Sequence, residues 1–266
     1  MQKSFTDQLG NTITINYPPK RIVSLVPSQT ELLFDLGLND EVVGITKFCI
    51  HPIEKFASTP KIGGTKKLKI NEIRALKPDL IIGNKEENTK EDIERLMQEF
   101  PVWMSDICTL EDALTTISEI GELVNRQPEA SYLNYLIKSG FADLQSLAAQ
   151  YAISLSALYL IWKKPYMAAG KNTFIDDVLT KIGLINIVEE QRYPGLSMED
   201  IKIMAPKMIL LSSEPYPFKQ QHIDELVAQL PQTKVLLVDG EMFSWYGSRL
   251  VKAVQYFFDF LQDVKD

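Results

Sequence analysis

Apolar and polar residues follow two different spacings along the chain, one typical of buried strands and one typical of amphipathic helices. Residues 4–15 alternate polar and apolar around Gly10-Asn11, which predicts a small N-terminal hairpin. The stretch "RIVSLVPSQTELLFDLGL" then predicts a strand over 22–26 and a helix after it. Ser28 and Glu31 have the spacing of a capping box at the start of that helix.

The same alternation of strand and helix continues to the end of the chain. Strands are predicted at 42–45, 102–105, 156–162 and 234–239, and helices at 90–100, 109–124, 173–183, 219–230 and 249–262. The remaining segments are predicted to be loops, including 46–52, 61–67 and 240–248. Such alternation is typical of an α/β fold, in which helices cover a sheet rich in parallel strands.

One segment occurs twice in similar form. "LKINEIRALKPDLIIG" begins at Leu68, and "LSMEDIKIMAPKMILLS" begins 128 positions later at Leu196. In both copies, apolar residues at helical spacing precede a proline, Pro78 or Pro206, and a short apolar run follows it. A proline cannot continue a helix, so each copy predicts a short helix, a turn and a buried strand. The repeat indicates two similar Rossmann-like lobes, although a chance similarity remains an alternative, because such passages are common in α/β proteins.

The segment 128–151 differs from the rest, since its apolar residues recur every three or four positions over more than twenty residues. It predicts one long helix, placed between the two copies. We therefore expect an N-terminal lobe at 1–127, a connecting backbone helix at 128–151 and a C-terminal lobe at 152–266. The alternative is a helix packed on a single continuous sheet.

Composition and charge narrow the possible functions. The net charge of −7 and the isoelectric point near 5.1 provide no overall basic field, which argues against a nucleic-acid partner. No apolar run is long enough to insert in a membrane. The N-terminus lacks the features of a signal peptide. Either the protein is cytoplasmic, or it is periplasmic or otherwise extracytoplasmic and its export signal is missing from this sequence. Cys49 and Cys108 are too few for a disulfide scaffold and are expected to behave as small hydrophobic residues.

Motifs of enzymes are missing from the sequence, including those of nucleophilic hydrolases, phosphate-binding loops and zinc proteases. We therefore expect no enzyme activity and no intrinsic cofactor. His51 follows a predicted strand and is a candidate axial ligand to a bound metal, although an ordinary loop histidine is the more common case. His222 lies within a predicted helix, where we expect it to be exposed to solvent.

Large side chains are concentrated in the predicted loops. The set comprises Phe48, Tyr166, Met167, Tyr193, Tyr216, Phe243, Trp245 and Tyr246. Ligands of open α/β sheets bind beyond the carboxyl ends of the strands, so about half of these residues are expected to line one cleft. Flat aromatic rings with few charges suit a bulky, partly apolar ligand. Arg192 and Arg249 flank the set and could pair with a ligand carboxylate or phosphate, although Arg249 could equally have a structural role.

Several motifs in order along the chain carry a resemblance to a known family. "FTDQLGNTITINYPPKRIVSLVPSQTELLFDLGLNDEVVGIT", "KIGG" and "INEIRALKPDLIIG" resemble the helical-backbone (class III) substrate-binding proteins of ABC transporters, and most closely the periplasmic cobalamin-binding branch. The resemblance covers almost the whole chain. It implies two α/β lobes joined by one long helix, with the ligand held between them.

The resemblance also implies which residues contact the ligand and the transporter. The implied ligand-binding positions are the loop around Phe48 and His51, Met167 in "PYMAAG", Tyr193 in "RYPG", and the loop from Glu241 to Trp245. Family members carry a glutamate on each lobe that docks to the permease. Glu199 occupies this position in the second copy of the repeat, whereas Asn71 replaces it in the first copy, with Glu72 next to it. Docking of the N-terminal lobe is thus an open point.

The leading hypothesis is a monomeric solute-binding protein that captures a corrinoid, such as cobalamin, in the cleft between the lobes for an ABC importer. Binding of a ferric siderophore or haem by the same fold is the nearest alternative. Those ligands are usually anionic and would need more arginine than Arg192 and Arg249 supply. A cytosolic corrinoid carrier or sensor without a permease partner is a third hypothesis.

Overall fold

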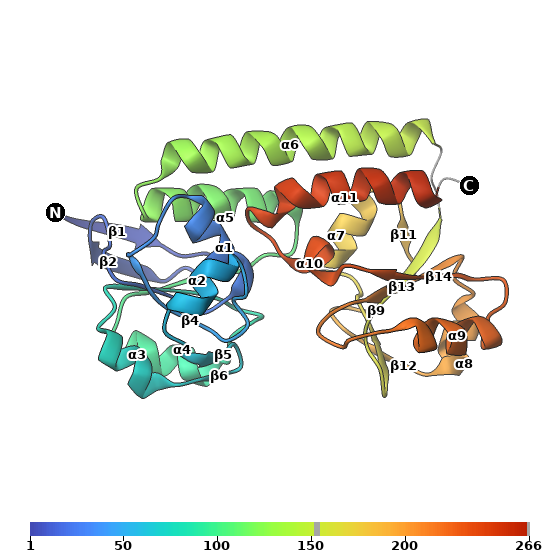
Figure 1. The fold of residues 1–266 in the computed structure, drawn as a ribbon, viewed down its shortest axis with the longest axis horizontal. Helices are drawn as coiled ribbons and strands as arrows, with labels where there is room; N and C mark the ends of the chain where they lie inside the picture. Colours follow the sequence, from blue (N-terminus) through green and yellow to red (C-terminus); the bar gives the residue numbers. More distant parts are fainter. Residues whose placement is uncertain (152–154, 265–266) are drawn as a thin grey trace. The chain divides into compact units, whose positions relative to one another are not determined.

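The computed structural model of the protein describes residues 1–151 and 155–264, and its chain divides into two compact units (Figure 1). Unit 1 comprises residues 1–107, 111–135 and 246–249, and unit 2 comprises the described residues among 108–110, 136–245 and 250–266. Residues 152–154 and 265–266 of the predicted C-terminal lobe lie outside the described residues. The lobe boundaries at 127 and 152 stay a prediction.

Unit 1 contains a four-stranded parallel sheet with the order β4-β3-β7-β8. Its strands are β3 (Ile22–Ser24), β4 (Val42–Ile45), β7 (Leu80–Asn84) and β8 (Val102–Ser105). These are the short apolar runs of the sequence, and nearly all of their residues are buried. A parallel strand covered on both faces needs such a continuous apolar run, so the sheet follows directly from the hydrophobic pattern.

Helices and two small hairpins complete unit 1. The helices are α1 (Pro27–Asp35), α2 (Ile53–Ser58), α3 (Ile70–Leu76), α4 (Lys90–Met97) and α5 (Leu110–Leu123). The hairpins are β1 (Gln2–Thr6) with β2 (Thr12–Asn16), and β5 (Gly63–Gly64) with β6 (Lys67–Leu68). The capping box predicted for α1 is wrong, because the helix begins one residue before Ser28, and Val26 is its N-cap residue without a side-chain cap.

Unit 2 contains a six-stranded sheet in which β12, β10, β9, β13 and β14 follow one another and β11 also pairs with β9. The strands are β9 (Ser156–Trp162), β10 (Tyr166–Ala168), β11 (Ile185–Asn186), β12 (Gly195–Leu196), β13 (Met208–Ser212) and β14 (Lys234–Val238). The strands β9, β13 and β14 are parallel, whereas β10 and β12 run antiparallel to their neighbours. The α/β fold class predicted from the sequence is confirmed.

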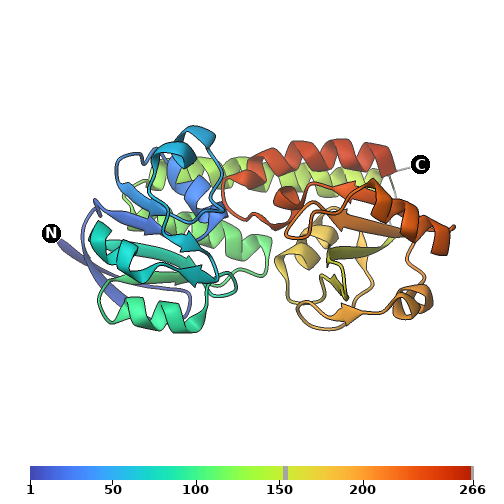
Figure 2. The ribbon, with the colours of Figure 1, turned by 60° about the horizontal axis from the view of Figure 1, so that its bottom comes forward.

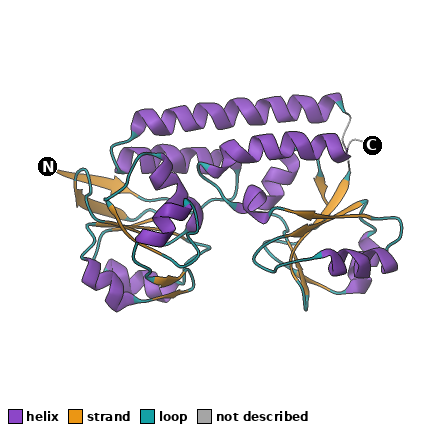
Figure 3. Ribbon diagram, in the orientation of Figure 1, coloured by secondary structure: helices purple, strands orange, loops and turns teal. Residues whose placement is uncertain are grey.

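The strands of unit 2 lie between helices (Figure 3). Its helices are α7 (Phe174–Lys181), α8 (Met198–Met204), α9 (Gln220–Gln229) and α10 (Gly240–Ser244), together with residues 136–150 of α6 (Gln127–Gln150) and all but the first residue of α11 (Arg249–Val264). Leu158 and Leu160 of β9 pack in an apolar cluster with Ile201 of α8 and Leu226 of α9. Alternate residues of a strand point to opposite faces of its sheet, so Tyr159 points the other way, where its ring lies 5.1 Å from that of Phe243.

The two copies of the sequence repeat adopt the same structure in register. Helices α3 and α8 begin and end 128 positions apart, as do strands β7 and β13. The residue after each helix, Lys77 or Ala205, has a left-handed backbone with φ of 48° or 46°. A left-handed residue ends a helix, and the proline that follows it prevents further helical bonding. The predicted helix-turn-strand repeat is confirmed.

The predicted long helix is also confirmed, as α6, which lies beside α11 in both views (Figures 1 and 2). Within unit 2 the two helices approach closely at Gly140. A Cβ atom at this glycine would lie 2.6 Å from both Cγ atoms of Val254 in α11. The ring of Phe141 packs nearby against that of Phe257, with 6.2 Å between the centroids. Gly140 therefore sets how closely α6 and α11 pack.

Substitution of this glycine should lower stability although alanine is the better helix former. Overpacking costs about 1–3 kcal/mol, against a gain of about 1 kcal/mol in helix propensity. We expect Gly140→Ala to lower the free energy of unfolding, measured by urea denaturation. The control is Ser139→Ala at the exposed neighbouring position, which should leave stability unchanged or slightly raise it. A Gly140→Ala variant more stable than the parent protein would contradict the close approach.

Candidate functional site

The loops that follow parallel strands collect at one edge of each sheet, which is where open α/β sheets bind ligands. In unit 1 these loops follow β3, β4, β7 and β8, and in unit 2 they follow β9, β13 and β14. Most of the residues predicted to bind a ligand lie in or next to these loops.

Phe48, in the loop after β4, presents an aromatic ring at this edge of unit 1. Its side chain is 49% exposed, which is unusual for a phenylalanine. One side of the ring lies against Gly64, where an added Cβ would be only 3.1 Å from Cε2 of Phe48. The Nζ atom of Lys47 lies 4.9 Å from the ring centroid. Phe48 is thus a supported ring with a large surface left open.

The loop that carries Phe48 is held in place by hydrogen bonds, including bonds to neighbouring segments. The backbone N–H of Lys47 donates to the carbonyl of Gly63 over 2.8 Å. Cys49 is fully buried, with its Sγ atom 3.1 Å from the hydroxyl groups of both Thr30 and Thr46. Burial raises the pKa of the Cys49 thiol. Cys49 is the buried small residue that the sequence predicted.

His51 lies in the same loop as Phe48 and is partly buried. The structure thus brings these two predicted residues together. Among residues 1–151 and 155–264, no group of three or more histidine, cysteine and acidic side chains could hold a metal ion. A metal-binding role of His51 would be that of a single ligand to a metal already held by a chelate, and this role stays a prediction.

A buried polar network supports the other loops of unit 1. Ser105 at the end of β8 accepts hydrogen bonds through Oγ from Gln29 over 2.5 Å and from Asn84 over 3.0 Å. Asn84, at the end of β7, accepts through Oδ1 from the backbone N–H groups of Glu86 and Glu87. The network was missed from the sequence because its members are single polar residues at strand ends, separated by up to 76 positions.

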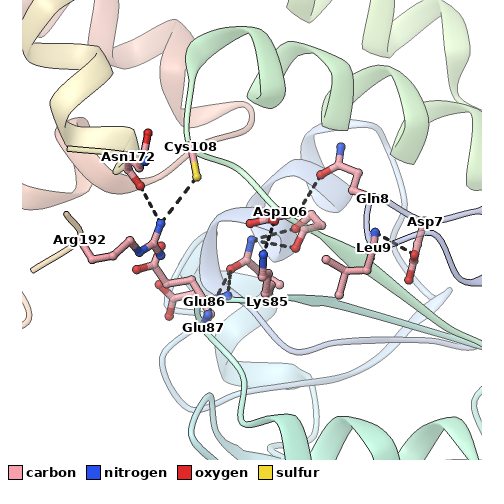
Figure 4. Close-up of polar contacts among 12 residues, drawn as sticks. Asp7, Gln8, Leu9, Lys85, Glu86, Glu87, Asp106, Cys108, Asn172 and Arg192 are labelled. Carbon is pink, nitrogen blue, oxygen red and sulfur yellow. Dashed lines mark hydrogen bonds and ion pairs between the residues drawn. The ribbon is translucent and has the colours of Figure 1, made fainter. Parts of the chain in front are cut away.

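Charged groups at this edge of unit 1 include both signs. Lys85 forms an ion pair with Asp106 at 2.6 Å (Figure 4). Lys66 donates to the backbone carbonyl of Glu86. Burial raises the pKa of the Glu87 carboxyl group. This edge of unit 1 therefore carries charges of both signs.

In unit 2, the structure places Tyr166 and Met167 on β10, each half-buried. Tyr166 pairs with Leu196 of β12, and burial raises the pKa of its phenol group. Tyr193, in the loop before β12, is also half-buried. The carbonyl of the next residue, Pro194, accepts from Ala168 at the end of β10 over 3.0 Å, so the structure brings Tyr166, Met167 and Tyr193 into one region of unit 2.

Arg192 is exposed, but its guanidinium group is engaged within the protein (Figure 4). Nη1 donates to the backbone carbonyl of Asn172 over 2.6 Å and lies 3.7 Å from Sγ of Cys108. The guanidinium carbon lies 5.9 Å from the ring centroid of Tyr193. These contacts hold the loop in place, so the predicted pairing of Arg192 with a ligand anion would compete with them.

The predicted loop from Glu241 to Trp245 is mostly a short helix, α10. Glu241 lies in its first turn, capped by Asp239, and is half-buried. Phe243 is fully buried and packs 4.8 Å from Phe257 and 5.1 Å from Tyr159. The structure therefore places the ring of Phe243 in the core of unit 2, contrary to the expectation that it faces a ligand. Its helical position turns it inward, which a loop assignment did not reveal.

Trp245 is only 6% exposed, and its indole Nε1 donates to Oε1 of Glu214 over 2.7 Å. Ser244 donates to the same carboxylate oxygen over 3.2 Å. Both contacts lie within unit 2 and fix the end of α10 to the loop after β13. In the structure Trp245 is thus a buried, hydrogen-bonded side chain, with little surface for the stacking role that the sequence suggested.

The last two predicted ligand residues, Tyr246 and Arg249, belong to unit 1, and both are buried. Arg249 donates through Nε to Oε2 of Glu31 over 2.8 Å, and both side chains of this pair are almost completely buried. Removing one partner of a buried pair typically costs about 3–5 kcal/mol, because it leaves an uncompensated charge. The structure therefore gives Arg249 the structural role that the sequence left open, at the start of α11.

The two predicted docking residues are exposed in the first turns of the repeated helices. Glu199 follows the N-cap residue Ser197 of α8, and Glu72 lies in α3, 3.5 Å from Lys69. Asn71, at the position that corresponds to Glu199, accepts from Arg74 over 3.0 Å. The two helices thus present different charges, although their backbones match.

His222, which the sequence predicted to be exposed, is buried at the start of α9. Its Nδ1 accepts from the backbone N–H of Lys219 over 2.8 Å, which caps the helix. Trp162 is a further residue missed from the sequence. It was assigned to a buried strand, but it lies at the carboxyl end of β9 and is 40% exposed.

Comparison with known proteins identifies the family to which this chain belongs. The sequence profile of a family described as periplasmic binding protein matches residues 22–232. A vitamin B12-binding protein of Vibrio campbellii is 27% identical over 202 residues, which cover 74% of this chain and 72% of that protein. An uncharacterized ABC transporter substrate-binding lipoprotein of Bacillus subtilis, YvrC, is 25% identical over 259 residues, which cover 94% of this chain and 82% of that protein.

Solved structures show the same fold. A periplasmic haem-binding protein of Pseudomonas aeruginosa superposes with a TM-score of 0.79 at 20% identity, covering 90% of this chain and 91% of its own. The predicted resemblance to substrate-binding proteins of ABC transporters is confirmed, and such proteins bind a substrate without converting it. None of the helices in the described residues combines the length and the apolar character required to cross a membrane.

The close contact between Gly64 and Phe48 leads to a test of whether this ring contacts a ligand. Gly64→Ala should push the ring aside by a few tenths of an ångström. If the ring contacts the ligand, we expect this variant to bind hydroxocobalamin about three- to tenfold more weakly, up to roughly 1.4 kcal/mol. Isothermal titration calorimetry measures the dissociation constant.

A double-mutant cycle provides the control. Phe48→Ala should weaken binding by itself, and Gly64→Ala should then add nothing, because the ring on which it acts is gone. Equal losses from Gly64→Ala in both backgrounds would show that the glycine acts through the backbone and not through Phe48. Unchanged affinity in Phe48→Ala would remove the ring from the ligand site.

Proposed function

Because this chain belongs to the periplasmic binding protein family, we propose that it captures a corrinoid such as cobalamin and delivers it to an ABC importer. No bond is made or broken in this function. Affinity comes from removing the broad apolar faces of the ligand from water, with a few polar groups to orient it. The exposed ring of Phe48 supplies one of these apolar contacts.

The observation that favours a corrinoid is the engagement of the two arginines next to the aromatic residues. Arg249 is paired with buried Glu31, and Arg192 donates to the carbonyl of Asn172. Haem and ferric siderophores carry anionic groups that arginine would bind best, through two parallel hydrogen bonds. A corrinoid carries neutral amides around its ring, so it has no need of a free arginine. The vitamin B12-binding relative supports the same choice.

Binding of haem or a ferric siderophore is the second candidate. The fold shared with a haem-binding protein supports it, as do two exposed lysines of unit 1: Lys47, whose Nζ atom lies 4.9 Å from the ring centroid of Phe48, and Lys66, which donates to the carbonyl of Glu86. An ammonium group pairs with a carboxylate as a point charge, with weaker geometric demands than a guanidinium group. A haem-binding site that uses these lysines would be compatible with the engaged arginines.

A ligand panel distinguishes the two candidates. Hydroxocobalamin, cobinamide, haem and an anionic ferric catecholate siderophore are titrated separately into the protein by isothermal titration calorimetry. We expect the two corrinoids to bind at least tenfold more tightly than haem or the siderophore, about 1.4 kcal/mol or more. Tighter binding of haem or of the siderophore would contradict the corrinoid proposal and identify the tighter-binding compound as the better candidate ligand.

We further propose that the protein acts outside the cytoplasm and docks to a permease through α8. Glu199 is exposed and lies in the first turn of this helix, where the helix dipole favours a carboxylate. In unit 1 the corresponding residue is Asn71, and Glu72 is the exposed acid next to it. A carrier or sensor without a permease is the alternative that Asn71 supports.

Docking makes a prediction that is separate from ligand binding. Glu199→Gln should reduce corrinoid uptake by cells that carry the matching importer about tenfold or more, while the dissociation constant for hydroxocobalamin stays the same. The control is Asp224→Asn, which removes an exposed carboxylate from α9 of the same unit and should leave uptake normal. Normal uptake with Glu199→Gln would argue against docking through this residue.

A further inference from the structure

Unit 2 carries an aromatic cluster at the carboxyl edge of its sheet that the site described above does not include. Trp162 ends β9, and its ring centroid lies 5.4 Å from that of Tyr216, in the loop after β13. The ring of Tyr216 packs in turn against Phe218 at 4.7 Å and against His222 at 5.5 Å. The cluster therefore extends from the apolar core to the surface of the unit.

The buried part of the cluster is rigidly held. Phe218 belongs to the apolar cluster between the sheet and helices α8 and α9. His222 accepts through Nδ1 from the backbone N–H of Lys219, and burial lowers its pKa, which favours the neutral ring. The loop is anchored at its other end too, since Glu214 accepts from the indole of Trp245 over 2.7 Å. Tyr216 between these anchors has a fixed place.

Trp162 is the exposed end of this cluster. Its side chain is 40% exposed, and no other aromatic residue is among the exposed large hydrophobic side chains in the described part of unit 2. An exposed tryptophan on a rigid strand offers a large flat surface that loses little entropy on binding, which is typical of a recognition residue. The contact with Tyr216 therefore supports the indole of Trp162, part of which stays exposed.

The register of the sheet relates Trp162 to the predicted ligand residues. Trp162 pairs with Met167 across the antiparallel strands β9 and β10. The strand register shifts next to this pair, and Tyr166, the residue before Met167, packs against the same apolar cluster as Tyr216. Lys163, the residue after Trp162, forms an ion pair with Glu225 of α9. The cation next to Trp162 is therefore paired, and the rings of Tyr166 and Tyr216 lie against one apolar cluster.

We propose that Trp162, supported by Tyr216, is a ligand-contacting residue of unit 2 that stacks against the flat face of a macrocyclic metal chelate. This inference rests on the proposed function, because it requires a chelate as the ligand. It assigns to Trp162 the stacking role that the burial of Phe243 and Trp245 leaves open. Tyr216 acts as a positioning residue, which holds the indole in place.

Binding measurements on three variants test the proposal, with hydroxocobalamin and haem as separate probes. Trp162→Ala should bind the probe that the parent protein prefers at least tenfold more weakly, whereas Trp162→Phe, which keeps a flat ring, should lose less than half of that factor. The control is Ile185→Ala, since Ile185 is also exposed but pairs with Ser156 at the amino end of β9. Its affinity should match that of the parent protein.

A spectroscopic measurement covers the case of a Trp162→Ala variant that fails to fold. The chain contains three tryptophans, and Trp103 and Trp245 are buried. With 5-fluorotryptophan incorporated, the fluorine resonance assigned to Trp162 through Trp162→Phe should shift when the probe binds. A folded Trp162→Ala variant with unchanged affinity, or an unshifted Trp162 resonance at saturation, would overturn the proposal.

Two other outcomes of these measurements would lead to different conclusions. Parent protein that binds neither hydroxocobalamin nor haem would overturn the proposed function and this inference together. A Trp162→Ala variant with unchanged affinity but reduced uptake would overturn ligand stacking and point to a contact with the transporter. Only the loss of affinity with Trp162→Ala, together with the partial retention by Trp162→Phe, supports a stacking role.

Discussion

Parallel pairing of the central strands is the constraint on which the rest of the structure depends. Parallel strands begin at one edge of a sheet and end at the other, so every loop that follows such a strand reaches the same edge. In unit 1 this gathers the loops after β3, β4, β7 and β8, and in unit 2 those after β9, β13 and β14. Residues that are far apart in the sequence, such as Phe48 and Ser105 in unit 1, thus lie at the same edge of the sheet because of the strand order alone.

Rigid support of exposed side chains is the second theme. Phe48 rests on Gly64, and edge-to-face ring contacts connect Trp162 through Tyr216 to Phe218 in the core. A binding protein gains affinity when its contact surfaces are ordered before the ligand arrives, because less conformational entropy is then lost on binding. The buried network around Ser105 and the hydrogen bond between Trp245 and Glu214 serve the same purpose. Both sets of hydrogen bonds hold loops that follow parallel strands.

Local pattern was sufficient to predict most of the fold, whereas the site depends on distant contacts. The strands β4 and β8 and the helix α6 follow from apolar periodicity, and the matched turns at Lys77 and Ala205 follow from the proline after each.

Glu31 was misassigned to a cap because its actual partner, Arg249, lies 218 positions away. Phe243 and His222 were misjudged because a five-residue helix and a helix cap, respectively, turn them inward. Trp162 was missed because an apolar strand pattern does not show where the sheet ends.

The central claim is the proposal that loops at the carboxyl edge of the sheet in each unit contact the ligand. Hydrogen–deuterium exchange of the protein, with and without saturating hydroxocobalamin, tests it most directly. The account predicts slower exchange in the loops 46–52 and 213–219, which follow β4 and β13, and no change in the turns 77–79 and 205–207, which precede β7 and β13. Protection of the turns at the amino edges, with the carboxyl-edge loops unaffected at saturation, would contradict the account.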